Sequence, residues 1–177
     1  MVVVALAGLR QLARARSFQV AGRLVDHVDT SERRVALTFD DGPTAPVIDR
    51  VLRVLGRRGV RATFFVTGRE LAELPEGGQR LVAAGHELGN HTYSHERMVL
   101  RSPSFVRSEI ERTDSLIRVA GHAGDIFVRP PFGYKLVGLP WYLHRSGRTT
   151  VMWDVEPDSW RLGVRVQWHH SNAPAFE

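Results

Sequence analysis

The stretch "VALTFDDGPT" (35–44) joins an apolar, β-prone run to two adjacent aspartates and a Gly-Pro pair. The β-branched and aromatic side chains predict a buried strand over 34–39, and the Gly-Pro pair predicts the turn that ends it. Asp40 and Asp41 therefore stand side by side at a strand end, where like charges repel each other. A nearby cation, either a metal ion or a basic side chain, would offset that repulsion.

Strand-like and helix-like segments alternate along the rest of the chain. Predicted strands cover 60–68, 86–92, 125–133 and 149–157, and predicted helices cover 46–59, 70–86 with an interruption near 75–78, 103–121 with Ser104 as its N-cap, and 137–147. Such alternation with short connections predicts a parallel sheet or barrel built of right-handed βα units. In these folds the chemistry lies at the carboxyl ends of the strands.

Length and composition narrow the class of protein. A chain of 177 residues predicts one domain, and the lack of cysteine excludes disulfides and thiolate ligands. The net charge is +5, and Lys135 is the only lysine among the 24 basic residues. This charge favours a mild attraction to anionic surfaces such as phospholipid or cell-wall polymers. No basic cluster with interleaved aromatic residues is found, so nucleic-acid binding is not expected.

The beginning of the chain leaves two alternatives open. "MVVVALAGL" (1–9) is as long as the apolar part of a signal peptide but lacks a basic start, and it is too short to span a bilayer. It is either the remnant of a signal or anchor, or the first turns of an amphipathic helix. We therefore divide the chain into a leader or peripheral segment (1–32) and a domain (33–177). An extracytoplasmic location follows as the expectation, with peripheral association to membrane or cell wall.

The stretch "GNHTYSH" (89–95) places two histidines, His91 and His95, four residues apart behind a second predicted strand end. Such a pair often arises by chance, so the hypothesis of a metal site rests on the position of the two histidines after a predicted strand end. Two imidazoles and one carboxylate would give a divalent metal three protein ligands and leave room for water and substrate. The second carboxylate would remain free as a base. Arg129, at another strand end, is placed to pair with it and lower its pKa.

Three motifs in order carry a family resemblance. "TFDDGP" (38–43), "HTYSH" (91–95) and "RPPFG" (129–133) resemble the first three motifs of the polysaccharide deacetylases, the NodB-homology group or carbohydrate esterase family 4. The resemblance covers residues 33 to about 160. It implies a distorted (β/α) barrel of NodB type and the hydrolytic removal of N- or O-linked acetyl groups from glycans such as chitin and peptidoglycan.

The resemblance also implies a role for each matching residue. Asp40 is expected as the general base, held by Arg129, and the backbone N–H of Phe132 as a donor to the oxyanion. Pro131 is expected to contact the substrate. The implied ligands of a divalent metal, usually zinc, are Asp41, His91 and His95.

The fourth motif fits less closely. Glu156 stands four residues before Trp160 in "WDVEPDSW" (153–160), where relatives usually have aspartate, and Asp154 and Asp158 are alternatives. Glu156 is expected to be one of the catalytic residues, and Trp160 is expected to line the acetyl pocket. The alternative is that Trp160 is an ordinary core or rim aromatic residue.

The fifth motif of the family is a strand that leads into Leu-x-His, whose histidine is the general acid. Here His169 and His170 are present, but no apolar strand leads into them. We therefore expect a barrel without its last strands and a domain that is incomplete at its C-terminus. The alternative to an active deacetylase is a degenerate pseudoenzyme or carbohydrate-binding remnant that lacks the acid.

Overall fold

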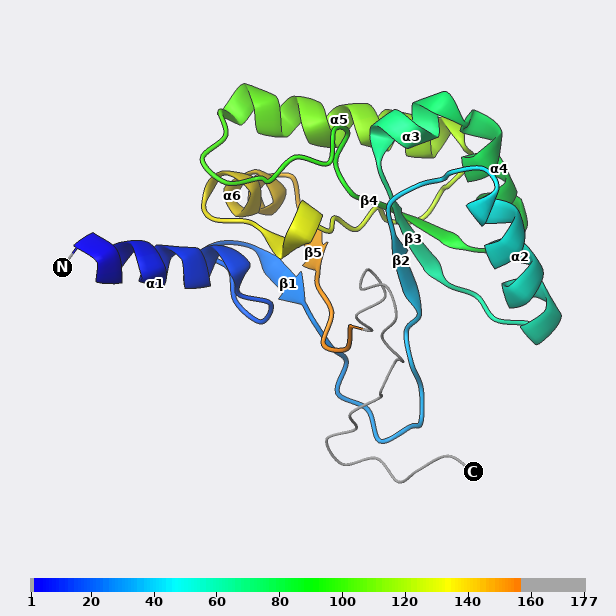
Figure 1. Cartoon of the computed structure of the whole chain (residues 1–177), viewed down its shortest axis with the longest axis horizontal. Helices are drawn as coiled ribbons and strands as arrows, with labels where there is room; N and C mark the ends of the chain where they lie inside the picture. Colours follow the sequence, from blue (N-terminus) through cyan, green and yellow to red (C-terminus); the bar gives the residue numbers. More distant parts are fainter. Residues whose placement is uncertain (1, 157–177) are drawn as a thin grey trace.

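The computed structural model describes residues 2–156, in which helices and strands alternate (Figure 1). The helices are α1 (Val2–Arg14), α2 (Val47–Arg58), α3 (Gly68–Glu73), α4 (Pro75–Ala83), α5 (Pro103–Val119) and α6 (Gly138–Arg145), with a 3-10 turn, η1 (Pro131–Gly133). The strands are β1 (Arg23–Val25), β2 (Thr38–Asp40), β3 (Thr63–Val66), β4 (Glu87–Asn90) and β5 (Thr149–Val151). None of the helices in this range is long and apolar enough to cross a membrane.

All strand pairs are parallel. Strand β3 lies between β2 and β4, and β5 pairs with β1. Val128 joins these two groups through single bridges to Asn90 and Thr150, so the spatial order is β2, β3, β4, Val128, β5, β1. The α/β class predicted from the sequence is confirmed. Within residues 2–156, β2 and β1 form the two edges of this row, and the row does not close into a barrel.

Two apolar clusters hold the helices to the sheet. The larger cluster lies beneath α2, α3 and α4 and includes the buried side chains Leu55, Val66, Leu81, Leu88 and Ile117. The smaller cluster lies beneath α5 and α6 and includes Met98, Ile110, Val128, Leu139 and Leu143. Figure 1 shows these helices over one side of the strands, with α2 and α4 at one end and α6 at the other.

All five predicted strands are shorter in the structure; for example, 60–68 is reduced to β3 (Thr63–Val66) and 149–157 to β5 (Thr149–Val151). The first begins at Thr38 rather than at residue 34, and Val35 is almost fully exposed. The segment 125–133 is reduced to the bridges at Val128, although its backbone is paired on both sides: Asn90 N–H donates to Phe127 O at 2.8 Å and Val151 N–H to Val128 O at 2.9 Å. Prolines follow directly after residue 129, and since they lack an N–H the pairing cannot continue.

The interruption predicted at 75–78 lies elsewhere. Pro75 is the first residue of α4, where its missing N–H costs nothing, and the break falls on Leu74. The two glycines that suggested a break permit close packing instead. A Cβ on Gly77 would lie 2.8 Å from Pro43 Cβ, and one on Gly78 would lie 2.5 Å from Leu71 Cδ1. Helix α4 therefore packs directly against the loop that follows Asp41.

The N-cap of α5 is Ser102 rather than the predicted Ser104. The Phe105 N–H donates to Ser102 Oγ at 3.2 Å, and Pro103 follows in the first helical position. A proline one residue after a serine is typical of such a start.

Strand β1 lies within the range 1–32 that the sequence suggested as a leader or peripheral segment. It pairs with β5 from Arg23–Thr149 to Val25–Val151, and Met152 N–H donates to Val25 O at 2.7 Å. This part of the range therefore belongs to the sheet.

A buried lysine anchors the end of α1. Lys135 is 1% exposed, its backbone N–H donates to Ala13 O at 2.9 Å, and its Nζ donates to Ala15 O. Burial lowers the pKa of Lys135 to about 8. The carbonyls that accept these bonds lie at the end of a helix, where such groups lack partners within the helix.

The lowered pKa predicts a pH dependence of stability. The folded protein releases the Lys135 proton near pH 8, whereas the unfolded chain holds it until about pH 10.4. The free energy of unfolding should therefore rise with pH in this window, by up to about 3 kcal/mol relative to Lys135→Met. Urea unfolding of both proteins at pH 7.5 and 10 measures the difference. A difference that stays constant would contradict the lowered pKa.

Candidate active site

The polar groups predicted for the site meet at one edge of the sheet. Asp40 ends β2, His91 follows the last residue of β4, and Arg129 follows Val128. Because the strands are parallel, these residues leave the sheet on the same side. The loop after Asn90 then brings His95 back to this edge.

Three side chains offer ligand atoms around one point. One ligand atom each from Asp41, His91 and His95 can be chosen so that all lie within 4.8 Å of one another. Asp41 Oδ1 is 3.2 Å from His95 Nε2 and 3.7 Å from His91 Nε2. Two ligands of a tetrahedral zinc ion are separated by about 3.4 Å, given metal–ligand bonds of about 2.1 Å. The spacing therefore fits a zinc-sized cation.

Hydrogen bonding fixes the tautomer of His91. Its Nδ1 lies 2.7 Å from the carbonyl oxygen of Arg129, which can only accept, so Nδ1 carries the proton. Burial lowers the pKa of His91, an effect that the charges of Asp40 and Asp41 oppose. The neutral ring then points the lone pair of Nε2 toward two carboxylates. Electron-rich atoms face one another there, and a cation between them would remove the conflict.

Asp40 divides its two oxygens between two partners. Oδ1 accepts from Arg129 Nη1 at 2.7 Å, and Oδ2 lies 4.0 Å from His91 Nε2. The Arg129 side chain is 3% exposed, and burial lowers its pKa while the charge of Asp40 opposes that effect. The guanidinium thus holds one oxygen in place and leaves the other near His91 Nε2, one of the three ligand atoms.

The turn after Arg129 carries the two residues predicted to meet the substrate. Phe132 has φ of +56°, a left-handed conformation that is rare for a large side chain. Its ring centre lies 4.7 Å from that of His95, and the side chain is 55% exposed. Pro131 is buried beside it. The Phe132 N–H makes no hydrogen bond to any of residues 2–156, so the described part of the chain leaves this donor free.

Glu156, the candidate residue of the fourth motif, forms an ion pair with Arg16. Its Oε2 pairs with Arg16 Nη2 at 2.6 Å, and the Arg16 guanidinium lies 4.6 Å from the ring centre of Trp153. The charge of Glu156 also opposes the lowering of the Arg129 pKa by burial, although more weakly than the charge of Asp40 does. Trp160, Asp158, His169 and His170 lie outside the described residues.

Two helical glutamates support the site, and the sequence reading missed both. Glu70 Oε2 accepts from Gly42 N–H at 2.6 Å and from Thr67 Oγ1 at 2.6 Å, which fixes the loop behind Asp41. Glu109 Oε2 accepts from the N–H groups of Tyr93 and Ser94 at 3.0 and 2.8 Å, which fixes the loop between the two histidines. For Glu109, the sequence did contain a signal: an acidic residue on the otherwise apolar face of the predicted helix.

Asn90 ties the same loop to α5. Its side-chain amide donates to Ile110 O at 2.9 Å and to Asp114 Oδ1 at 2.8 Å, and its Oδ1 accepts from Thr92 N–H at 2.8 Å. A carboxamide offers two N–H donors and two acceptor lone pairs, and three of these four sites form hydrogen bonds here. Asn90 therefore sets the direction in which the chain leaves β4.

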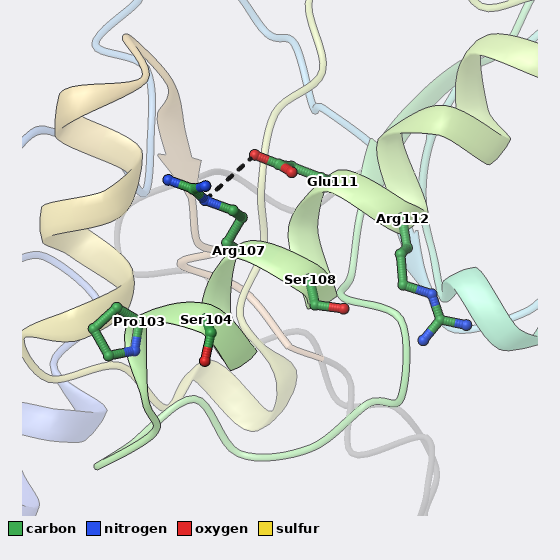
Figure 2. Close-up of a pocket in the computed structure, with 6 residues that line it drawn as sticks. All are labelled: Pro103, Ser104, Arg107, Ser108, Glu111 and Arg112. Atoms are coloured by element: carbon green, nitrogen blue, oxygen red, sulfur yellow. Dashed lines mark ion pairs between the residues drawn. The ribbon is translucent and has the colours of Figure 1, made fainter.

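The structure has one hollow next to this edge and another at a distance from it. One, of about 270 Å³, lies behind Asp40 and Asp41 between the sheet and α2, and apolar side chains such as Val51 and Phe64 line it. The other lies on the exposed side of α5, where Figure 2 shows the ion pair of Arg107 and Glu111. Arg107 Nε and Glu111 Oε1 are 3.8 Å apart. The second hollow contains none of the predicted site residues.

A parallel α/β fold with carboxylate, imidazole and guanidinium groups at the strand ends is the architecture of an α/β enzyme. The family model for polysaccharide deacetylase matches residues 27–151, more than half of the chain. This chain belongs to the polysaccharide deacetylase family. The match begins before residue 33, so it includes part of the range expected as a leader.

Individual relatives agree with this assignment. The peptidoglycan-N-acetylglucosamine deacetylase of Bacillus cereus is 34% identical over 132 residues, which cover 74% of this chain and 48% of that protein. A solved structure of a peptidoglycan N-acetylglucosamine deacetylase is similar with a TM-score of 0.73 at 32% identity, covering 77% of this chain and 64% of that one. A carbohydrate esterase 4 pseudoenzyme from Bacillus anthracis has a TM-score of 0.72 at 25% identity, covering 80% and 50%. The chain thus spans about half the length of the curated relative above.

We predict that Asp41→Ala and His91→Ala each abolish stoichiometric zinc binding. For the native protein, zinc at a hundredfold excess over Kd should raise the melting temperature by about 5–10 °C. His144→Ala, which removes an exposed histidine far along the chain, should bind zinc normally. Elemental analysis and thermal unfolding measure both effects. Native protein that neither retains zinc nor gains stability from it would rule out the ligand set.

A second prediction concerns the support of the histidine loop. Glu109→Ala leaves two partly buried N–H groups without their acceptor, which should lower zinc affinity by about 10–100-fold. Glu111→Ala is the matched control, since Glu111 lies on the exposed side of the same helix. Calorimetric titration of both variants with zinc decides the matter. Equal affinities would show that Glu109 does not position the ligands.

Proposed function

We propose that this site removes acetyl groups from acetylated glycans by hydrolysis, with Asp40 as the general base. The observation that carries the proposal is the division of Asp40 between Arg129 on one oxygen and the ligand group on the other. A base needs an oxygen that is oriented yet free to take a proton, and this geometry supplies one.

Asp41, His91 and His95 are the residues that would hold a divalent cation, and we propose zinc. The donor set of two imidazoles and one carboxylate and the neutral His91 ring support this choice. When bound, such an ion would polarise the acetyl carbonyl and lower the pKa of water.

The remaining steps belong to the side chains and backbone of this chain. Asp40 Oδ2 accepts the proton of the attacking water, while Arg129 keeps Asp40 in place and stabilises its charged form. The Phe132 N–H donates to the oxygen that gains charge as the tetrahedral intermediate forms. Its left-handed conformation is a strained arrangement of the kind found at functional sites. Pro131 and the exposed Phe132 ring offer contacts to the sugar.

We infer the glycan and the location from the relatives. The two peptidoglycan deacetylases named above act, by their names, on peptidoglycan, so we propose an N- or O-acetylated glycan of the cell envelope as substrate. The same reasoning supports an extracytoplasmic location with peripheral association to the cell wall or membrane. The net charge of +5 favours binding to anionic envelope polymers.

A pseudoenzyme is the second candidate function, and one contact favours it. Glu156, the predicted fourth-motif acid, is engaged by Arg16 at 2.6 Å. A structural neighbour described as a pseudoenzyme shows that the fold also occurs without activity. In this case the chain would keep the metal and the glycan but hydrolyse neither amide nor ester.

The decisive variant is Asp40→Asn. It keeps the shape of the side chain and its contact with Arg129 but cannot accept the proton, so acetyl hydrolysis should fall by about 10²–10⁴-fold. The substrates are an aryl acetate, whose leaving group needs no proton, and an N-acetylglucosamine oligomer, whose leaving amine does. Zinc binding should persist, because Asp40 is not a ligand. Both rates are measured with zinc-loaded protein.

The matched control is Asp49→Asn, which changes an exposed carboxylate on α2. Hydrolysis that survives Asp40→Asn would exclude Asp40 as the base, and native protein inactive on both substrates would favour the pseudoenzyme. We expect the aryl acetate to be cleaved and the amide to react weakly, since among residues 2–156 no further histidine joins the triad at this edge. Strong amide cleavage would make His169 and His170 the first residues to test as the acid.

A further inference from the structure

Three large apolar side chains are exposed around the start of α6. Leu100 is 85% exposed, Val137 is 55% exposed and Trp141 is 54% exposed. Val137 and Trp141 are four residues apart at the beginning of the helix, so they lie on the same face of it. We call these three residues the apolar patch.

The loop that carries Leu100 lies alongside the start of α6. Met98 and Lys135 form a parallel bridge, and a Cβ on Gly138 would lie 3.7 Å from the carbonyl oxygen of Arg101. Figure 1 shows this loop beside α6, at the end of the molecule away from α2. The patch is therefore formed by two neighbouring segments of the chain.

The backbone of Leu100 is strained. Its φ is +54°, in the left-handed region that large side chains rarely adopt. Conformations of this kind occur preferentially at functional sites. Because the side chain is almost fully exposed, packing within the described part of the chain does not account for a leucine at this position.

The segments around the patch are basic. Residues 97–108 and 126–153 contain arginine and lysine but no aspartate or glutamate. Arg97 and Arg145 are exposed, and within residues 2–156 neither forms an ion pair with a carboxylate.

These two arginines lie close to the apolar side chains along the chain. Arg145 follows Trp141 by four residues on the exposed face of α6, and Arg97 precedes Leu100 by three. Glu96, the acidic residue next to Arg97, is already paired with Arg101. Apolar side chains beside unpaired positive charge complement a surface that is anionic outside and apolar beneath, as a phospholipid bilayer is.

The size of the patch favours lipid over protein as its partner. Together the three side chains expose on the order of 400 Å² of apolar surface, a size at which exposed patches are often functional. A stable protein–protein interface buries about 800 Å² on each partner, which is more than this patch offers. A bilayer surface needs less, because tryptophan and leucine enter the headgroup region while arginines pair with phosphates.

We propose that the apolar patch, together with Arg97 and Arg145, binds the surface of an anionic phospholipid membrane. The proposal rests on the peripheral association proposed above, and it names the partner and the surface that meets it. The residues of the candidate active site take no part in this contact.

Vesicle binding tests the proposal. The complete 177-residue protein is sedimented with vesicles of phosphatidylcholine alone and with vesicles of equal parts phosphatidylcholine and phosphatidylglycerol. We expect affinity at least tenfold higher for the anionic vesicles. Added salt should weaken this binding without abolishing it, since salt screens charges but not apolar contacts. Equal affinity for the two kinds of vesicle, or no binding to either, would overturn the proposal.

Variants locate the contact on the patch. Leu100→Asn, which suits the left-handed backbone, and Trp141→Gln should each lower the affinity for anionic vesicles at least fivefold. Arg145→Gln should lower it about fivefold, the effect of one basic residue near an anionic surface.

The matched controls are Val119→Gln and Arg53→Gln, which remove an exposed apolar residue of α5 and an exposed arginine of α2. Both should bind anionic vesicles like native protein. Losses in the controls equal to those in the patch variants would show a general effect of hydrophobicity or charge and overturn the proposal. If a variant fails to fold, the comparison of the two kinds of vesicle on native protein still decides.

Two other partners are distinguished by the same variants. Long-chain polyphosphate that binds as tightly as the anionic vesicles, with no loss of vesicle binding in Leu100→Asn, would identify an anionic polymer as the partner and overturn the proposal. A dimer in sedimentation equilibrium that Trp141→Gln disrupts, in protein that binds no vesicles, would assign the patch to a second copy of the chain and overturn it as well.

Activity separates this inference from the proposed function. Hydrolysis of a soluble aryl acetate should be the same in Leu100→Asn and in native protein, because Leu100 is not part of the candidate active site. Vesicle binding without hydrolysis of any acetyl substrate would refute the proposed function and retain the membrane contact. Hydrolysis without vesicle binding would refute the membrane contact alone.

Discussion

The buried guanidinium of Arg129 connects almost every part of the site. Its Nη1 donates to Thr38 Oγ1 and Asp40 Oδ1 on β2, while its Nε and Nη2 donate to the carbonyl oxygens of Val151 and Met152 at the end of β5. In the sheet these two strands are separated by β3, β4 and the paired residue Val128, and the guanidinium also lies 3.9 Å from the centre of the Phe65 ring on β3. A buried cation is costly unless its donors are satisfied. Arg129 thus requires the strand ends to curve toward it, and the same curvature gathers the carboxylates and imidazoles at one point.

The side chains of the site depend on two levels of support. Asp40 and Arg129 are placed by the sheet itself, whereas Asp41 and His95 stand on loops and have positive φ values of 70° and 58°. Such conformations persist only where the surroundings enforce them. Glu70 and Glu109 provide that enforcement from α3 and α5, because each accepts hydrogen bonds from the backbone of one loop. Helices that never touch the reacting atoms therefore decide where those atoms lie.

The sequence allowed the α/β class and the meeting of Asp40, Asp41, His91, His95 and Arg129 to be predicted, because strand ends in parallel folds share an edge and the motifs occur in order. Strand lengths were not predictable, since apolar character at 35–37 does not reveal which residues find a pairing partner. The place of β1 was hidden for the same reason: three residues, Arg23–Val25, carry no periodic pattern, and only pairing with β5 makes them a strand. Glu109 was missed because a single acidic residue on an apolar helix face does not say which N–H groups it meets.

The burial of Lys135 has a consequence for chemical labelling. This chain has a single ε-amine, and in the folded state its side chain is enclosed by the end of α1. An acylating reagent can reach that amine only when the α1 end separates from the turn after Gly133. The rate of acylation at Lys135 therefore measures the rate or population of local opening, in the same way that amide exchange reports the opening of a hydrogen bond. Labelling of this one lysine thus gives a residue-specific measure of how often the end of α1 separates from Lys135.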